Sequence, residues 1–350
     1  MTSTHDGRRV AGAGHRTAGD ALLAVDDLAV EFRTSAGPVR AVNGVSLALA
    51  AGETVGLVGE SGSGKSVTSR AIMGLLPPKT STTRGSIRLD GEELVGIGEK
   101  RYRKIRGERI AMVFQDPLTA LNPLYRAGEQ VAEALRFHFG MAQGEALKRA
   151  RDLFVDVGLP DPDSVVQKYP HELSGGMRQR VMIAMALACE PELLIADEPT
   201  TALDVTIQAQ ILDLMRELQA DFGMGVVAEM AERVAVMYAG QIVEEADTPA
   251  LFADPMHPYT RGLIGSVPVI GRRQHELAVI PGRVPNLINL PPGCRFAPRC
   301  EARIQAGLTQ CTVDMPALVE VGPGRKVRCF LHSDEVQVDV PVVLTKKQAG

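Results

Sequence analysis

Apolar and polar residues alternate along two early segments, residues 22–32 and 39–49, which flank a Ser-Ala-Gly-Pro turn. Such alternation predicts two antiparallel strands with one buried face. Further apolar runs, with helical patterns between several of them, lie at residues 54–58, 85–89, 109–114, 193–196 and 233–237. Strands that alternate with helices predict an α/β fold, in which a largely parallel, helix-covered sheet is flanked by an antiparallel β subdomain.

Changes of pattern divide the chain into regions. Between Gln115 and Pro191 the pattern is mostly helical, which predicts a helical subdomain at about residues 116–190, inserted within a domain of residues 21–256. After Pro255 the composition shifts to proline, glycine and cysteine, so we expect a small appended module at residues 257–340. Residues 1–20 and 341–350 are expected to be tails.

Composition narrows the function classes. The 38 basic and 42 acidic residues give a formal charge of -4, which provides no overall field that favours nucleic acid. Arg, Glu, Gly or Pro interrupts every long apolar stretch, so any membrane role is expected to be peripheral. Four of the five cysteines lie beyond residue 293, which argues against a general disulfide framework and favours a cytosolic setting.

The segment Gly59–Ser66, GESGSGKS, matches the phosphate-binding P-loop pattern. It follows the strand expected at residues 54–58 and precedes a helix expected at residues 65–76, ended by two prolines. In such a loop Gly62 and Gly64 let backbone N–H groups face phosphate oxygens, Lys65 reaches the β and γ phosphates, and Ser66 ligates magnesium. The alternative is a glycine-rich turn, which the strand–loop–helix setting disfavours. The predicted nucleotide-binding residues here are Gly59, Glu60, Ser61, Gly62, Ser63, Gly64, Lys65 and Ser66.

Paired carboxylates, Asp197 and Glu198, follow the apolar run at residues 193–196. Ligands bind at the carboxyl ends of strands in open α/β sheets, where the P-loop is also expected. We therefore predict that Asp197 holds magnesium and that Glu198 orients or deprotonates the attacking water. A solvated acidic pair at the entry to a helix is the alternative.

The sequence LSGGMRQR, which begins at Leu173, places Ser174, Gly175 and Gly176 in a turn that opens a helix. Together with the P-loop and the acidic pair it resembles the ATP-binding subunits of ABC transporters, over about residues 21–245. The resemblance implies that this turn closes on ATP held by the P-loop of a second ABC ATPase subunit, so that a monomer is incomplete.

The same resemblance assigns further residues. Gln115, in VFQDP, matches the glutamine that touches the metal and the attacking water. Asp204 matches the loop that communicates between the two ATP sites. The aromatic residue that stacks on adenine in this family has only a weak candidate here, Phe32, which suits the core equally well.

Three longer segments narrow the resemblance: residues 114–130, PHELSGGMRQR from Pro170, and HPYTRGL at residues 257–263. They look like the oligopeptide/dipeptide (and nickel) importer branch. Membership implies two integral-membrane permeases that dock on the helical segment after Gln115, an external solute-binding protein, and a place on the cytoplasmic face of the cell membrane. His171 and His257 belong to these motifs, and we expect both to be structural because no metal constellation surrounds them.

Four cysteines, Cys294, Cys300, Cys311 and Cys329, are separated by five, ten and seventeen residues. The importer branch carries a C-terminal cysteine motif that in some members ligates an iron-sulfur cluster, and a zinc ion on four thiolates is the chemical alternative. Buried or free thiols are the third interpretation. Cys189, among Ala and Leu residues, is expected to pack in the core.

One part of the family pattern is missing. After the helix expected at residues 205–222, only residues 223–228 precede a helical-looking EMAERV segment, and no histidine lies between His171 and His257. Relative to the family, about ten residues that carry a strand and a γ-phosphate-contacting histidine are absent. We therefore predict weakened folding and impaired hydrolysis, with retained ATP binding. The alternative is a shortened strand at Val226 and Val227 with a substitute catalytic residue.

These observations leave two leading hypotheses: an ATPase subunit that powers a peptide importer, or a non-hydrolysing partner in a heterodimeric importer ATPase. A soluble ABC-type protein that acts on nucleic acid is a third class, which the charge and the importer motifs disfavour.

Overall fold

A computed structural model describes residues 21–198, 205–227, 231–266 and 280–333. The chain forms two compact units. The first contains the described residues within 1–30, 44–56 and 66–232, and the second those within 31–43, 57–65 and 233–350. Within the described residues no helix is both long and apolar enough to cross a membrane.

The first unit contains a parallel sheet, as the alternation of strands and helices predicts. Its order is β3 (Thr54–Val58), β8 (Gly225–Val227), β7 (Leu193–Ala196) and β6 (Ile110–Val113). All four residues of β6 and of β7 are buried, which is typical of parallel strands covered on both faces. The bounds of β3 and β7 agree with the sequence prediction.

An antiparallel sheet flanks it, again as predicted. The strand order is β2 (Gly37–Leu49), β1 (Leu23–Thr34), β4 (Ser81–Leu89) and β5 (Glu92–Glu93). The two early segments of alternating pattern form β1 and β2, which are slightly longer than the pattern predicts.

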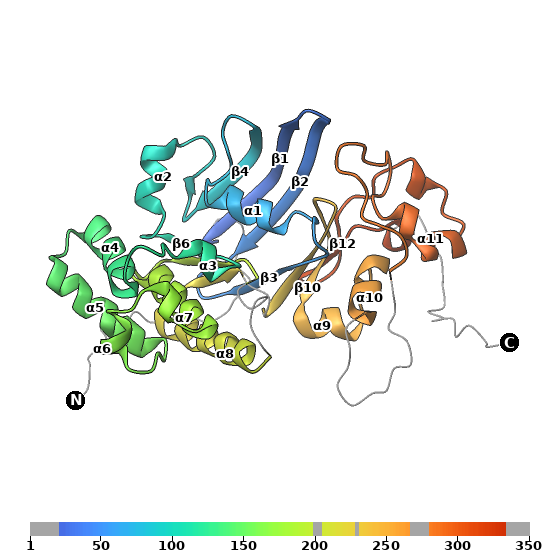
Figure 1. The fold of residues 1–350 in the computed structure, drawn as a ribbon. Helices are drawn as coiled ribbons and strands as arrows, with labels where there is room; N and C mark the ends of the chain where they lie inside the picture. The colour runs from blue at the N-terminus through green and yellow to red at the C-terminus, as the bar shows by residue number, and fades with distance from the viewer. Residues whose placement is uncertain (1–20, 199–204, 228–230, 267–279, 334–350) are drawn as a thin grey trace. The chain divides into compact units, whose positions relative to one another are not determined.

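Helices occupy most of the chain between β6 and β7. These are α3 (Pro117–Ala120), α4 (Ala127–Phe139), α5 (Gln143–Asp156), α6 (Pro162–Val165) and α7 (Gly175–Leu187), with a short 3-10 turn, η1 (Pro170–Glu172), before α7. Helices α4 and α5 pack against each other, and α7 packs on β6 (Figure 1). Their shared core includes Leu135, Leu153 and Ile183, each at most 1% exposed.

Three further helices in this unit are α1 (Lys65–Ile72), α2 (Glu99–Ile105) and α8 (Val205–Phe222). The predicted extension of α1 to residue 76 is wrong. Gly74 has a φ of 61° and its N–H donates to the carbonyl of Ala71, so a left-handed glycine ends the helix before the prolines are reached.

The predicted loss of an interior strand is also wrong, because β8 is present. Leu194 pairs with Val226 on one side of it, and Thr54 pairs with Val226 on the other. The connection from α8 is short because Gly223, with a φ of 63°, turns the chain, and the N–H of Gly225 donates to Glu192 O at 2.9 Å. The shortened-strand alternative is therefore the correct one for the fold.

The EMAERV segment is not helical at its carboxyl end. Its last two residues, Arg233 and Val234, are the first two of strand β9. Residues 228–230 lie outside the described residues.

The second unit contains an antiparallel sheet in the order β11 (Val319–Gly322), β12 (Arg325–Val327), β10 (Gln241–Asp247) and β9 (Arg233–Tyr238). A two-residue turn of Ala239 and Gly240, with φ of 46° and 82°, joins β9 to β10, as in a type I′ hairpin. The helices of this unit are α9 (Thr248–Ala253), α10 (Pro258–Gly265) and α11 (Glu301–Gln305), with the short turns η2 (Ala297–Arg299), η3 (Gln310–Thr312) and η4 (Phe330–His332).

Candidate functional site

The acidic pair of the first unit lies at the carboxyl end of β7. The Asp197 N–H donates to Val113 O at 3.1 Å, which continues the pairing with β6 by one residue. Asp197 Oδ1 accepts a hydrogen bond from Ser66 Oγ at 3.0 Å, and Asp197 is only 9% exposed. The sheet thus brings together a carboxylate and a hydroxyl from distant parts of the sequence, and both are oxygen ligands that suit Mg²⁺.

Glu198 has a φ of 50°, which is uncommon for a residue with a side chain. Gln115 Nε2 donates to Glu198 Oε2 at 2.7 Å, and Gln115 is exposed. Gln115 follows β6 and Glu198 follows β7, so two neighbouring parallel strands place these side chains at one edge of the sheet. The predicted catalytic pair therefore lies together.

The loop of residues 59–65 belongs to the second unit, and its glycines are required by geometry. A Cβ on Gly59 would lie 2.2 Å from Met237 O, and one on Gly64 would lie 2.8 Å from Ala41 O. Gly62 has a φ of 79°, which strains any other residue. The close backbone contacts on one side leave the loop curled, as phosphate binding requires.

Two polar groups of this loop fit a phosphate. Ser63 is 1% exposed, and among the described residues its Oγ has no hydrogen-bond partner. Buried hydroxyls are normally hydrogen-bonded, so this group is suited to a ligand oxygen. Lys65 Nζ donates to Gly59 O at 2.8 Å and so lies across the loop. The residues present fit a nucleotide phosphate.

The signature turn is accessible at the start of α7. Ser174 is the N-cap of this helix, with its Oγ accepting from the Met177 N–H at 3.3 Å. Ser174 and Gly175 are exposed and Gly176 is half-buried, whereas Leu173 is buried. Asp204 lies outside the described residues, and Phe32 is half-buried in β1.

His257 has a structural role. Its Nδ1 accepts from the Tyr259 N–H at 3.0 Å and so caps α10. Burial, together with the nearby His332 and Arg261, lowers the pKa of His257 to about 3. His171 stacks on Tyr169 with ring centroids 5.6 Å apart.

The four C-terminal cysteines line one cavity in the second unit, beside Phe296 and Phe330. All are free, and burial raises the pKa of Cys300 to about 11 and that of Cys329 to about 12. In the described part of the chain, however, no three potential ligands are placed to hold a metal ion. Cys294, Cys300, Cys311 and Cys329 therefore share a cavity, but the described geometry shows no formed iron-sulfur or zinc site. Cys189 is buried in the core of the first unit, as expected.

The fold, the P-loop serine held against a strand-end aspartate, and the capped signature turn define an ATP-binding protein of the ABC class. Residues 42–201 match the ABC transporter family, and residues 243–306 match the C-terminal region of oligopeptide/dipeptide transporters. The chain belongs to the ATP-binding proteins of the oligopeptide/dipeptide ABC transporter family and is an ABC transporter ATPase.

Similar proteins extend along most of the chain. Oligopeptide transport ATP-binding protein AppD of Bacillus subtilis is 50% identical over 90% of this chain and 98% of its own length. OppD of the same organism is 48% identical, over 93% of each chain. Dipeptide transport ATP-binding protein DppD, also of Bacillus subtilis, is 48% identical over 90% of this chain and 96% of its own length.

Among solved structures, the dimeric post-hydrolysis state of the ATP-binding cassette MJ0796, bound to ADP and Pi, matches with a TM-score of 0.58 and 30% identity. That match covers 64% of this chain and 98% of the other. The cbiO1 protein of Clostridium perfringens matches with a TM-score of 0.57 and 27% identity, over 67% of this chain and 92% of its own.

Two residues that contact the P-loop were not foreseen in the sequence. Tyr259 Oη accepts from the Glu60 N–H, and Arg299 donates to the Glu60 carboxylate. The HPYTRGL motif contains Tyr259 but does not indicate what its hydroxyl group contacts. Nothing in the sequence around Arg299 indicates a partner 239 residues away.

Proposed function

We propose that this chain is the ATP-binding subunit of an importer of dipeptides or oligopeptides, in which ATP binding and hydrolysis drive uptake through partner permeases. The transported class follows the names of the similar proteins AppD, OppD and DppD. Nickel is the alternative solute. The observation that carries the ATP site is the 3.0 Å hydrogen bond from Ser66 Oγ to Asp197 Oδ1, which joins the two expected magnesium ligands.

The chemistry proposed is in-line transfer of the γ phosphoryl group to water. Lys65 and the N–H groups of the loop bind phosphates. Ser66 and Asp197 would hold Mg²⁺, which would supply positive charge to neutralise the charge that develops on the phosphoryl group. Glu198 accepts the proton of the attacking water, and Gln115, 2.7 Å away, fixes the position of that carboxylate.

We propose that a second ABC ATPase subunit, identical or related, completes each site. Ser174, Gly175 and Gly176 supply backbone and hydroxyl groups to ATP held by the partner, and Asp204 belongs to the loop that communicates between the two sites. The exposure of Ser174 and Gly175 at a helix N-terminus supports this role.

The proposed permease-docking face follows Gln115. Leu118 is 63% exposed, Leu124 80% and Tyr125 58%. Apolar residues gathered in this way on one short segment are typical of protein interfaces. A chain that attaches to two permeases there lies at the cytoplasmic face of the membrane. On the opposite face, an external solute-binding protein delivers the peptide to the permeases.

We propose further that hydrolysis by this chain is impaired. Strand β8 ends at Val227, and no histidine lies between His171 and His257 to complete the γ-phosphate environment. A non-hydrolysing partner in a heterodimer is the alternative role. Glu198→Gln separates the two roles: loss of transport-coupled hydrolysis supports an active subunit, and unchanged turnover supports the degenerate partner.

ATP binding is tested by titration of the purified chain with a fluorescent ATP analogue and Mg²⁺. Lys65→Ala removes the charge that reaches the phosphates, so the affinity is expected to fall by roughly tenfold or more. The exposed Lys79→Ala serves as the matched control and is expected to bind normally. Equal affinity of the wild type and Lys65→Ala would contradict the proposed site.

The iron-sulfur cluster or zinc ion stays a separate hypothesis for Cys294, Cys300, Cys311 and Cys329. What supports it is the shared cavity that all four thiols line. Visible absorbance and metal analysis of anaerobically purified protein test it. A colourless, metal-free sample leaves four buried thiols that only pack.

A further inference from the structure

The P-loop belongs to the same compact unit as the chain from residue 233 onward. Two side chains from that later region contact Glu60, the second residue of the loop. Arg299 donates to both carboxylate oxygens of Glu60, through Nη1 at 2.8 Å and Nη2 at 3.2 Å. Tyr259 Oη accepts from the Glu60 N–H at 2.8 Å. Glu60 is thus held at both its side chain and its backbone.

Arg299 is itself fixed by the surrounding backbone. Its Nε donates to Pro281 O at 2.7 Å, and Nη2 also donates to Ile280 O at 3.3 Å. The guanidinium lies over the Tyr238 ring at 5.8 Å, and its side chain is 4% exposed. A guanidinium with every branch engaged cannot follow a moving carboxylate, so it acts as a preorganised anchor.

Tyr259 is fixed by the cap of α10. His257 accepts the Tyr259 N–H, and the Tyr259 ring packs on Tyr238 at 4.6 Å and on Phe296 at 5.5 Å. The tyrosine is fully buried. The HPYT motif therefore directs one hydroxyl group at the first peptide of the P-loop.

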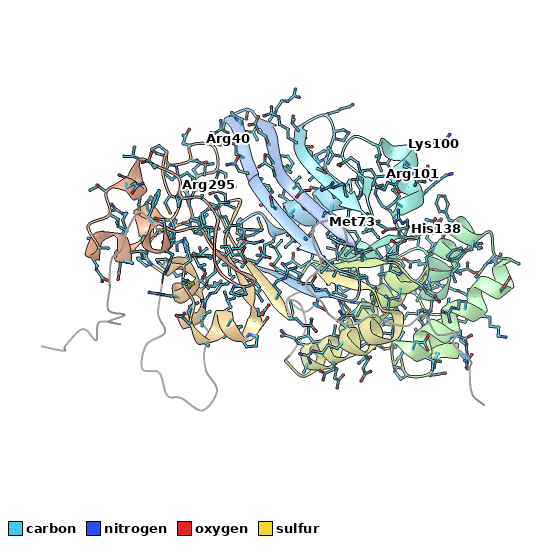
Figure 2. The ribbon with its side chains drawn as sticks, turned by 180° about the vertical axis from the view of Figure 1, so that it is seen from behind. Arg40, Met73, Lys100, Arg101, His138 and Arg295 are labelled. Atoms are coloured by element: carbon cyan, nitrogen blue, oxygen red, sulfur yellow. The ribbon has the colours of Figure 1, made fainter. Side chains whose placement is uncertain are left out.

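A third contact reaches the loop through a hairpin. Gly240 N–H donates to Ser63 O at 2.7 Å, and the buried Arg295, labelled in Figure 2, donates to the carbonyl of the adjacent Ala239. Residues 59–63 of the loop are therefore held at both ends by groups of the second unit.

The charge of Glu60 gives this arrangement a functional meaning. A carboxylate in a phosphate-binding loop repels a triphosphate unless a cation compensates it. We propose that Arg299 and Tyr259 are positioning residues for ATP binding: Arg299 neutralises and anchors Glu60, and Tyr259 fixes the backbone of the loop. The region after β10 is thereby part of the ATP site without touching ATP. This inference rests on the proposed ATP binding.

The test uses the full chain and two measurements. Hydrogen exchange of loop peptides is measured without nucleotide, and affinity for a fluorescent ATP analogue is measured with Mg²⁺. Arg299→Ala leaves the Glu60 carboxylate unpaired, so we expect loop exchange to rise and affinity to fall by roughly tenfold. Adding Glu60→Gln to Arg299→Ala removes the uncompensated charge and is expected to restore affinity to within about threefold.

The matched control is Arg303→Ala, an arginine of the same region whose Nε donates to Ala297 O and not to the loop. Arg299→Gln removes the charge but keeps a long side chain, and it replaces Arg299→Ala if that variant does not fold; it is expected to lose affinity that Glu60→Gln again restores. Absence of rescue, or an equal loss in Arg303→Ala, would overturn the proposal. Because exchange is read without nucleotide, failure of ATP binding in the wild type remains distinguishable from failure of the anchor.

Discussion

Strands β7 and β8 are hydrogen-bonded neighbours in one parallel sheet, but their carboxyl ends differ. β7 leads into Asp197 and Glu198, which bind Ser66 and Gln115 at 3.0 and 2.7 Å. β8 is three residues long, and no histidine follows it before residue 257. The residues that follow β7 are the predicted catalytic ones, whereas β8 itself consists of one glycine and two valines.

The difference shows that pairing of a strand in the sheet and placement of a catalytic side chain at its end are separate requirements. A parallel strand needs backbone groups in register and apolar side chains, and Gly225–Val227 supplies both. A catalytic edge needs one particular side chain at one position. We therefore expect the shortened segment to preserve the fold and ATP binding and to impair turnover.

The largest expected effect tests whether β8 contributes to the core as β7 does. Leu194 and Val226 pair with each other and are 0% and 3% exposed. Leu194→Ala is expected to lower the free energy of unfolding by about 3 kcal/mol, and Val226→Ala by about 2 kcal/mol, because each leaves a cavity. Denaturant unfolding measures both. Val155→Ala, half-exposed on α5, is the control and is expected to change stability by at most about 0.5 kcal/mol.

If Val226→Ala lowers the free energy of unfolding by less than about 0.5 kcal/mol, β8 does not contribute to the core as β7 does. The short strand would then lie in the sheet without stabilising it.

The second effect concerns chemistry. Insertion between Gly225 and Val226 of about ten residues that restore a full strand and a histidine at its end is expected to raise steady-state phosphate release by roughly a hundredfold. The same insertion with alanine in place of the histidine is the control and separates the strand from the side chain. Equal rates in all three proteins would show that the native chain hydrolyses ATP by another residue.

The sequence predicts those parts of the molecule that local pattern determines. The bounds of β3, β7 and α8 agree because apolar runs and glycine or proline boundaries mark them. The approach of Ser66 to Asp197 follows from strand order at one edge of the sheet.

Long-range pairing is what local pattern conceals. Strand β10 reads as charged because it contains Glu244 and Glu245, which are 0% and 4% exposed. Glu244 is compensated by the N–H groups of Met256 and His257, and Glu245 by Arg233. The Glu60–Arg299 pair is hidden for the same reason. Strand β8 is only the alternative prediction from the sequence, because three residues are fewer than strands normally have.

The smallest expected effect concerns the side-chain hydrogen bonds near β8. On the side away from β7, Thr54 Oγ1 of β3 donates to Gln219 Oε1 of α8 at 2.8 Å, and Gln219 Nε2 donates to Gly52 O at 2.9 Å. Thr54→Val keeps the shape but leaves a half-buried amide oxygen without this donor, so the free energy of unfolding should fall by about 1 kcal/mol.

Thr119→Val, at an exposed threonine, is the control. Denaturant unfolding and ATP-analogue titration are measured on the same samples. Reduced stability with unchanged affinity would mean that the hydrogen bonds of Thr54 and Gln219 stabilise the sheet around β8 without affecting the acidic pair after β7. A parallel loss of affinity would mean that the carboxyl ends of β7 and β8 depend on each other.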